Sequence, residues 1–467
     1  MKLFSKNISP YSLIVIGLLL FRAFLNYAIP LMDKTEARYA EIARIMSETN
    51  NWITPQIDYG VPFWAKPPLS TWFSAMSFEL FGVSEFTARL PYLLLSILIL
   101  LLIGKYAKRK GLDFFIPAVI LLTIPEFLIH AGVVSTDTSL AFCVTLVMLS
   151  FWEGIYNKEQ RIWRYLFFVG LGLGLLAKGP IIIILTGPPI FIWLILTKEF
   201  KNLWKAFPWF IGILITALVA VPWYYIAEQK TPGFIDYFIV GEHFKRFLSS
   251  DWQGDKYGFP KSQPLGMIWV FLIAFAIPWI LIVIKKLWQN KFEIFKNKWV
   301  LYLFLWLLWT PLFFTVSKSL IHPYIMPVMV PIALLISYWW SEIKNKKRFI
   351  GGALVFPIIA LTLYIVITIS GKKEYYINSD KYLIEKNSVD DLPIYHWQHK
   401  SYSGQFYTKG AIMAIKDTLE LKKHLSLNDS FLILIPHKKV KYIGTTNMAL
   451  LKQLDANYKK GIYIFNE

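Results

Sequence analysis

The feature that most constrains this chain is a series of apolar runs of about 16 to 24 residues, each long enough for a helix to cross ~30 Å of hydrocarbon. Hydrophobic residues make up 56% of the 467 positions and charged residues only 17%, against roughly a quarter in soluble proteins. These values exclude a soluble enzyme. Because a chain in lipid must satisfy its own backbone hydrogen bonds, the runs predict helices, and we expect an all-α polytopic membrane protein.

Eleven runs qualify as spans, and a further segment at 69–82 is uncertain, so we expect about 11–13 transmembrane helices. The runs cover residues 11–31, 87–104, 113–133, 137–156, 164–177, 181–197, 207–227, 265–284, 299–316, 322–340 and 349–370. The first run follows Lys2 and Lys6, as in a signal peptide, but it carries Arg22 and lacks a small-x-small cleavage pattern. It therefore predicts an uncleaved anchor.

Basic residues gather between alternate spans, in residues 105–110, 157–164, 198–205, 285–298 and 342–348. Cytoplasmic loops carry an excess of Lys and Arg, so this pattern predicts a cytoplasmic N-terminus. The net charge of +19 is then a topology signal, and we expect no nucleic-acid partner. The opposite, outer side receives residues 32–86, 134–136, the Lys178 turn, 228–264, 317–321 and everything after 370.

From about residue 371 the sequence becomes mixed and polar, with short strand-like runs at 392–397, 430–437 and 461–467 and a helical stretch at 417–425. This pattern is typical of a small α/β domain. We therefore predict two domains, a membrane domain at 1–370 with its first outer loop at 32–86, and an extracytoplasmic α/β domain at 371–467.

The first outer loop contains a predicted helix at 35–48. At 100° per residue, one arc carries Glu41, Arg44 and Glu48, and the opposite arc carries Tyr39, Ile42, Ala43 and Met46. We expect this helix to lie along the membrane surface. Arg38 falls on its apolar side, where it either snorkels, pairs with Glu41, or contacts a phosphate through its forked donors.

Three more charged residues flank this helix. Asp33 and Glu36 either form a capping box or act as catalytic carboxylates, and the two roles are compatible. Lys66 precedes Pro67 and Pro68, which hold it at the mouth of a span. It is either an interfacial anchor or an anion ligand.

The remaining outer segments bring further polar residues. Asp137 begins a span and suits an N-cap, whereas Lys178 interrupts a long apolar run at the outer interface. The segment VGEHFKRF contains Glu242, His243 and Arg246. His243 beside one glutamate is a weak metal signal, because a metal site needs more ligands.

Lys318, His322 and Tyr324 follow the ninth span. A pocket formed by cations from five separate outer segments would bind an anionic lipid headgroup while apolar walls hold its tail. Those cations are Arg38, Lys66, Lys178, Arg246 and Lys318.

The ordered motifs TEARYAEIA, NWITP, Lys-Pro-Pro, ARLP, STDTSLAF, LLAKGP, PWY, EHFKRF and SKSLIHPYIMP resemble the bacterial protein O-mannosyltransferase superfamily, close to the lipid A aminoarabinose transferases. The match extends over about residues 30–340. The resemblance implies the GT-C fold and a glycosyltransferase that moves a sugar from a polyprenyl phosphate carrier to a lipid, glycan or protein acceptor. It also implies the inner membrane of a bacterium, with the active face outside.

The resemblance assigns roles to particular residues. It implies a catalytic acid among Asp33 and Glu36, carrier-phosphate contacts from Arg38 and Lys66, and a Glu-His loop near the site. We expect Lys178, Arg246 or Lys318 to help bind the phosphate, and we assign Tyr39, Asp137, Glu242, His243 and Tyr324 to the substrate pocket. The family usually has Asp-Glu where this chain has Thr35-Glu36, and the aminoarabinose transferases have Glu where it has Ala65.

The expected mechanism is inverting displacement at the anomeric carbon, with a carboxylate as general base and the cations stabilising the departing phosphate. No cofactor is assigned; a divalent metal, with His243 as its candidate ligand, stays open. Two alternatives remain. A lipid-linked sugar flippase predicts polar residues at mid-depth in two matched halves, which this sequence lacks. A non-catalytic envelope assembly protein would use the C-terminal domain.

Overall fold

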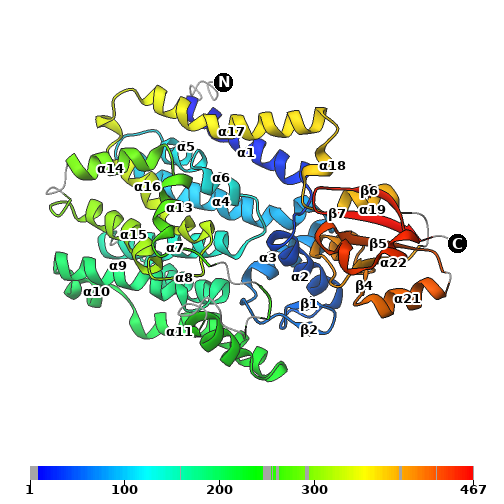
Figure 1. Ribbon diagram of the computed structural model, residues 1–467. Coiled ribbons are helices and arrows are strands. Elements are labelled where there is room, and N and C mark those ends of the chain that lie inside the picture. Colours follow the sequence, from blue (N-terminus) through cyan, green and yellow to red (C-terminus); the bar gives the residue numbers. More distant parts are fainter. Residues whose placement is uncertain are drawn as a thin grey trace, which may run out of the picture.

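The computed structural model describes residues 9–157, 159–245, 254, 256–258, 262–289, 294–388, 392–427 and 429–465. A bundle of helices is followed by a small domain of helices and strands that lies at one end of the bundle (Figure 1). The expected fold class, a helical bundle with a small C-terminal α/β domain, is confirmed. How these two parts meet decides where the functional residues lie.

In the described part of the chain, five helices are long and apolar enough to cross a membrane. They are α1 (Pro10–Ala28), α4 (Glu85–Arg109), α7 (Thr136–Tyr156), α11 (Trp209–Lys230) and α17 (Lys346–Ile369). A sixth arises if α13 (Met267–Phe275) and α14 (Trp279–Gln289), bent by 109°, form one span. Shorter apolar helices include α8 (Ile162–Lys178), α9 (Ile181–Thr197) and α15 (Lys298–Phe314). The total of 11–13 stays a prediction.

Several expected spans are broken. The run at 113–133 forms α5 (Ile116–Leu122) and α6 (Pro125–His130), and Pro125 occupies the first position of α6. Proline suits a helix start but cannot continue a preceding helix. The run at 322–340 begins as a 3-10 helix, η2 (His322–Val328), before α16 (Met329–Tyr338). Hydropathy alone does not detect these breaks.

Helix α7 is the centre of the bundle. In its most apolar 18-residue window 89% of residues are buried, against 22% in α11 and 11% in α17. Its aromatic neighbours Trp193, Trp306 and Tyr302 are fully enclosed. Helices α11 and α17 instead expose apolar side chains along their length, as expected of helices that face lipid. The turn that precedes α7 contacts residues 32–86, where the Val134 amide donates a hydrogen bond of 3.4 Å to Glu36.

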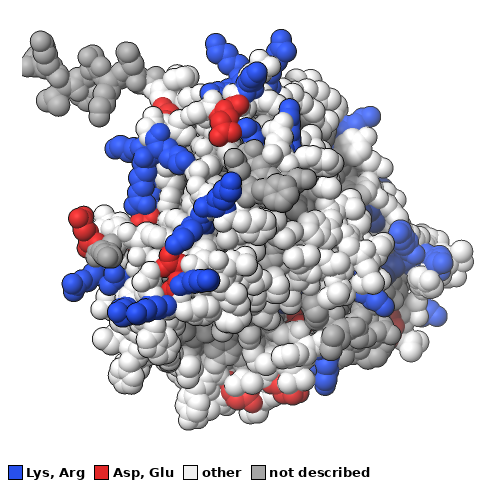
Figure 2. Space-filling view, turned by 90° about the vertical axis from the view of Figure 1, so that its left-hand side faces the viewer, with Lys and Arg blue, Asp and Glu red and all other residues white. Residues whose placement is uncertain are grey.

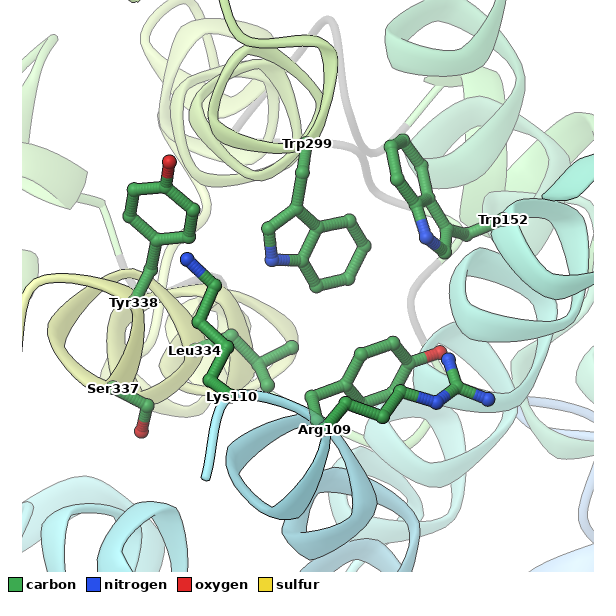
Figure 3. A pocket seen from close by; sticks show the side chains of 8 residues that line it. Arg109, Lys110, Trp152, Trp299, Leu334, Ser337 and Tyr338 are labelled. Carbon is green, nitrogen blue, oxygen red and sulfur yellow. The ribbon is translucent and has the colours of Figure 1, made fainter. Parts of the chain in front are cut away.

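Basic side chains gather at the end of the bundle remote from the α/β domain. Figure 2 shows more Lys and Arg than Asp and Glu on that face, near α10 (Phe200–Ala206) and the start of α17. A recess of about 250 Å³ opens there between Lys110, Trp152, Trp299 and Tyr338 (Figure 3). The Lys110 ammonium lies 3.3 Å from the centre of the Tyr338 ring. The aromatic lining is typical of a membrane interface.

The C-terminal domain contains a five-stranded sheet in the order β4-β3-β5-β7-β6. The strands are β3 (Ile394–Trp397), β4 (Met413–Ile415), β5 (Phe431–Pro436), β6 (Lys452–Ala456) and β7 (Lys460–Phe465). Strand β3 runs parallel to β4 and β5, while β7 is antiparallel to β5 and β6. The three predicted strands and the predicted helix, α21 (Thr418–Ser426), are confirmed; β4 and β6 were not predicted.

Short helices accompany this sheet in the C-terminal part of the chain. They are α18 (Lys373–Tyr376), α19 (Lys381–Asn387), α20 (Tyr402–Tyr407), η4 (His437–Tyr442) and α22 (Thr445–Ala449), while η3 (Trp340–Glu342) belongs to the bundle and precedes α17. In α20, the Tyr407 hydroxyl accepts a hydrogen bond from the Leu31 amide at 2.8 Å. In α19, Lys381 pairs with Glu85 at 2.5 Å. The domain is therefore docked on the first outer loop.

Candidate functional site

The first outer loop folds as helix α2 (Thr35–Thr49), a small hairpin of β1 (Gln56–Asp58) and β2 (Val61–Pro62), and helix α3 (Leu69–Phe81). The predicted helix at 35–48 is confirmed. Glu41 and Arg44 of its polar arc are buried like its apolar arc and are joined by two hydrogen bonds of 2.7 and 2.8 Å, whereas Glu48 is exposed. The C-terminal domain covers one side of α2, so this helix is enclosed by protein on both faces.

The predicted capping box is not present. Lys34 is the N-cap of α2 and makes no side-chain capping bond. The Asp33 carboxylate instead accepts hydrogen bonds from the Ser403 amide at 2.9 Å and hydroxyl at 2.6 Å. The Lys460 ammonium lies 3.9 Å from the Asp33 carboxylate and pairs with the Asp380 carboxylate at 2.5 Å. Burial and the neighbouring Asp380 raise the pKa of the Asp33 carboxyl. Asp33 thus joins the loop to the C-terminal domain.

Glu36 pairs with Arg89 at the start of α4. Two hydrogen bonds of 2.8 Å join the guanidinium to the carboxylate, and both side chains are buried. Burial acts to raise the pKa of Glu36, but the charge and hydrogen bonds of Arg89 outweigh it and lower the pKa below its ordinary value. Arg89 also donates to the backbone oxygens of Asn26 and Pro30. This pair fixes α2 to α1 and α4.

Arg38 lies among aromatic rings and pairs neither with Glu41 nor, in the described residues, with another acid. One guanidinium nitrogen donates to the backbone oxygen of Tyr257 at 2.6 Å. The rings of Tyr39, Phe63 and Tyr402 have their centres 5.3, 5.6 and 5.9 Å from its central carbon. Its Nε is buried without a hydrogen-bond partner. A guanidinium with an unused buried donor is suited to receive an anion.

Lys66 follows the hairpin and binds Glu242 of the next outer segment, η1 (Asp236–Lys245), with Nζ 3.1 Å from Oε2. Both side chains are mostly buried. The Tyr237 hydroxyl lies 3.4 Å from the other carboxylate oxygen of Glu242. The rings of Tyr237 and Tyr257 are in contact, with their centres 5.8 Å apart. Tyr257 therefore links the residues around Lys66 to Arg38.

Lys178 ends α8 and pairs with Asp137 at 2.5 Å. Its ammonium also lies 4.4 Å from the centre of the Tyr324 ring. The N-cap of α7 is Ser135, so the predicted N-cap role of Asp137 is wrong; its carboxylate instead neutralises Lys178. An ion pair at this depth in an apolar bundle costs desolvation energy, which makes Lys178 and Asp137 candidate functional residues.

His243 lies between the Lys66–Glu242 pair and the Lys178–Asp137 pair. Its Nδ1 is 2.8 Å from the Phe238 carbonyl and its Nε2 is 3.2 Å from the Lys178 carbonyl. Burial lowers the pKa of His243, so the neutral ring can donate from one nitrogen only. Because both nitrogens face backbone oxygens, His243 and Glu242 are not arranged as metal ligands. Within the described residues, the His and carboxylate group with metal-ligand spacing lies elsewhere, at Glu126, His130 and His322.

The structure thus brings most of the predicted residues into one place, the end of the bundle next to the C-terminal domain. The members of this cluster, which we call the outer-face cluster, are Arg38, Tyr39, Lys66, Asp137, Lys178, Glu242, His243 and Tyr324. Asp33 and Glu36 are close in sequence but turn their carboxylates away, toward Ser403 and Arg89. Lys318 is exposed, and Arg246 lies outside the described residues.

The sequence reasoning missed four residues that organise the cluster. Arg89 belongs to the motif ARLP but was given no role. Tyr237 and Tyr257 line the space between Arg38 and Lys66. Tyr402 comes from the C-terminal domain, 364 positions after Arg38, and no local signal points to it. Of these four residues, only Arg89 had a signal in the sequence, namely its position as an arginine at the start of a predicted span.

Comparisons with known proteins identify the relatives of this chain. Residues 28–238 match the family model described as dolichyl-phosphate-mannose-protein mannosyltransferase. An undecaprenyl phosphate-alpha-4-amino-4-deoxy-L-arabinose arabinosyl transferase of Wigglesworthia glossinidia brevipalpis is 30% identical over 78% of this chain. The corresponding protein of Aeromonas hydrophila is 30% identical over 75%. The chain belongs to the protein O-mannosyltransferase superfamily.

A solved member of this superfamily has the same fold. The crystal structure of ArnT from Cupriavidus metallidurans bound to undecaprenyl phosphate superposes with a TM-score of 0.75, covering 98% of both chains at 18% identity. The predicted GT-C-like, multi-pass membrane architecture is therefore confirmed. The chain spans 65% of the length of the Wigglesworthia and Aeromonas relatives, and 54% of one from Pseudomonas fluorescens.

Proposed function

We propose that this protein is a glycosyltransferase that moves a sugar from a polyprenyl phosphate carrier to an acceptor at the outer face of a bacterial inner membrane. The observation that carries the proposal is the convergence of Arg38, Lys66 and Lys178, from three separate outer segments, at one end of an apolar bundle. A lipid phosphate needs this combination, because its charge requires cations and its chain requires an apolar wall. The names of the relatives, which specify an undecaprenyl phosphate donor, support the same class of carrier.

In the proposed orientation the N-terminus is cytoplasmic and the C-terminal domain extracytoplasmic. The support is the basic face of Figure 2, which lies at the end of the bundle opposite to the outer-face cluster. Cytoplasmic loops are enriched in Lys and Arg, so this face belongs inside. The same reasoning divides the chain at about residue 370, after the last apolar helix.

The proposed chemistry is displacement at the anomeric carbon with the carrier phosphate as leaving group. Charge grows on the phosphate oxygens in the transition state, and Arg38 and Lys66 are placed to stabilise it. Lys66 and Lys178 are paired with Glu242 and Asp137, so an arriving phosphate competes with these carboxylates. The buried Nε of Arg38 is free to bind it at once. Lys318 and Arg246 remain predicted helpers.

Two assignments of the general base are proposed for test. The first is Asp33 or Glu36, as the family resemblance implies; the raised pKa of Asp33 suits a base, and the lowered pKa of Glu36 does not. The second is Glu242, which contacts Lys66 at the centre of the outer-face cluster. We favour Glu242, because the base must lie within reach of the reacting centre beside the phosphate.

The test is mass spectrometry of polyprenyl-phosphate sugars and of envelope lipids, glycans and proteins in cells with and without this chain. We expect a carrier-linked sugar to accumulate and one acceptor modification to disappear, which names both substrates. Complementation with Glu242→Gln, Asp33→Asn and Glu36→Gln then identifies the base. Unchanged pools despite normal protein levels would refute the proposal and favour transport or envelope assembly.

A further inference from the structure

A second cluster of polar residues lies inside the bundle, separate from the phosphate contacts proposed above. Glu126 and His130 are four positions apart on α6, so their side chains share one helix face. His322, the first residue of η2, meets them from a distant part of the chain. The Glu126 carboxylate lies 3.1 Å from Nδ1 of His130 and 2.9 Å from Nδ1 of His322.

These three side chains have the chemistry and spacing of a transition-metal site. One ligand atom from each lies within 4.8 Å of the other two. An ion bound tetrahedrally at about 2.0–2.2 Å holds its ligand atoms about 3.3–3.6 Å apart. The observed distances of 2.9 and 3.1 Å therefore need to widen by only a few tenths of an ångström to admit one. Two histidines and one glutamate are also a known ligand set for zinc.

The surroundings hold the ligands in place. The His322 ring stacks on Phe275 with centres 4.6 Å apart and planes 9° apart. Glu126 and His130 are buried, whereas the His322 side chain is 38% exposed, which leaves a path for an ion to enter. Around them the bundle is apolar, with Phe127 and Ile325 completely enclosed. A buried carboxylate in such surroundings requires a positive partner.

We propose that Glu126, His130 and His322 bind one divalent transition-metal ion of the zinc class. His130 and His322 bind as neutral imidazoles through Nδ1, and Glu126 binds as a carboxylate. The ion connects α6 to η2, and through η2 it fixes Tyr324, whose ring contacts Lys178. The three residues are positioning residues for the outer-face cluster, and the ion is structural.

The alternative is a hydrogen-bonded triad without metal, in which both imidazoles donate to Glu126. Nδ1 of His130 is also 3.1 Å from the backbone oxygen of Glu126, so it has an acceptor when no ion is bound. The two states differ in a measurable way. A metal-bound site takes up one ion per chain, and a hydrogen-bonded triad takes up none.

The experiment uses the full chain, purified in detergent through a histidine-free tag and stripped with a chelator. Zn²⁺ is titrated and bound metal is counted by mass spectrometry, and Co²⁺ is added separately to record its visible absorption. We expect one Zn²⁺ per chain and an intense Co²⁺ spectrum typical of four-coordination. His322→Asn should weaken binding by more than the roughly 10- to 100-fold that loss of an outer-shell partner costs.

His399→Asn is the matched control, because His399 is exposed in the C-terminal domain and should leave binding unchanged. Zn²⁺ should also raise the unfolding temperature of the wild type and of His399→Asn but not of His322→Asn, since a ligand stabilises only the state that binds it. Sub-stoichiometric metal in the wild type, or equal binding by His322→Asn, would overturn the proposal. Both readouts are independent of transferase activity.

Discussion

Replacing Glu36 with glutamine tests whether this carboxylate is structural or catalytic. The wild-type carboxylate accepts two charge-assisted hydrogen bonds of 2.8 Å from Arg89 and weaker ones of 3.4 Å from the amides of Met32 and Val134. Glu36→Gln keeps the shape but leaves Arg89 buried without a counter-charge. Breaking a buried ion pair on one side costs roughly 3–5 kcal/mol of stability, which raises the equilibrium constant for unfolding by about two to nearly four orders of magnitude.

The assay is equilibrium unfolding in mixed micelles titrated with sodium dodecyl sulfate, run beside a transfer assay on the same preparation. Glu79→Gln on α3 is the matched control, because Glu79 is exposed and bonds only to Ser47 among the described residues. It should change stability by less than about 0.5 kcal/mol. Adding Arg89→Gln to Glu36→Gln should recover part of the loss, since the double variant buries no unpaired charge. Glu36→Gln with wild-type stability and no transfer would refute the structural role.

The pH dependence gives a second check on the same pair. The folded-state pKa of Glu36 is lowered from its ordinary 4.5, because the charge and hydrogen bonds of Arg89 outweigh burial. A depressed carboxyl pKa contributes stability above the unfolded value and loses it as pH falls through the folded value. The stability difference between wild type and Glu36→Gln should therefore be complete above pH 4.5 and shrink below it. A difference that grows toward acid pH would contradict the assignment.

Three further predictions concern the outer-face cluster and the C-terminal domain. Lys66→Met should lower the turnover number of the folded protein by about 100- to 1,000-fold, as loss of one transition-state donor does, whereas the exposed Lys318→Met should lower it far less; equal losses would refute the ranking. Lys460→Met should destabilise the chain by roughly 3–5 kcal/mol in the same micelle titration, and adding Asp380→Asn should recover part of it, because Lys460 pairs with Asp380 at 2.5 Å. Burial and the nearby charge of Lys460 lower the pKa of His396 from 6.5 to about 4, so the stability of the folded chain should rise with pH between these two values. His396→Gln should flatten this rise, and an unchanged pH dependence of stability would contradict the prediction.

Local signals in the sequence were enough to place individual elements. The helix at 35–48 is observed as Thr35–Thr49, because good helix formers continue until Asn50 takes a left-handed conformation, φ 53°. The span at 137–156 is observed as Thr136–Tyr156. Strands β3, β5 and β7 were also found, because each is a short apolar run between turn residues.

Pairings between distant segments could not be predicted. Glu41 has an arginine three residues away on either side, Arg38 and Arg44, and only the packed structure shows that Arg44 is its partner. Asp33 meets Ser403 across 370 positions and Glu36 meets Arg89 across 53. A capping box explains both acids from local sequence alone, so no signal favoured the tertiary partners.

The last residue of interest, Tyr402, tests whether the C-terminal domain contributes to the site or only supports it. Its ring lies 5.9 Å from the central carbon of Arg38, which extends from the first outer loop. A cation–π contact is worth about 0.5–2 kcal/mol, so Tyr402→Ala should weaken carrier use by roughly 2- to 30-fold, seen mainly in KM. Tyr402→Phe keeps the ring and should stay near wild type.

Tyr458→Ala is the control within the same domain, since Tyr458 is 44% exposed and far along the chain from the docking helix α20. If Tyr402→Ala and Tyr458→Ala both leave KM and turnover unchanged, the domain serves only as a support for Asp33 and the loop. If Tyr402→Ala alone raises KM, the site is shared between two parts of the chain. The position of the Arg38 guanidinium between the rings of Tyr39 and Tyr402 favours this second result, because contacts from both parts of the chain then set its orientation.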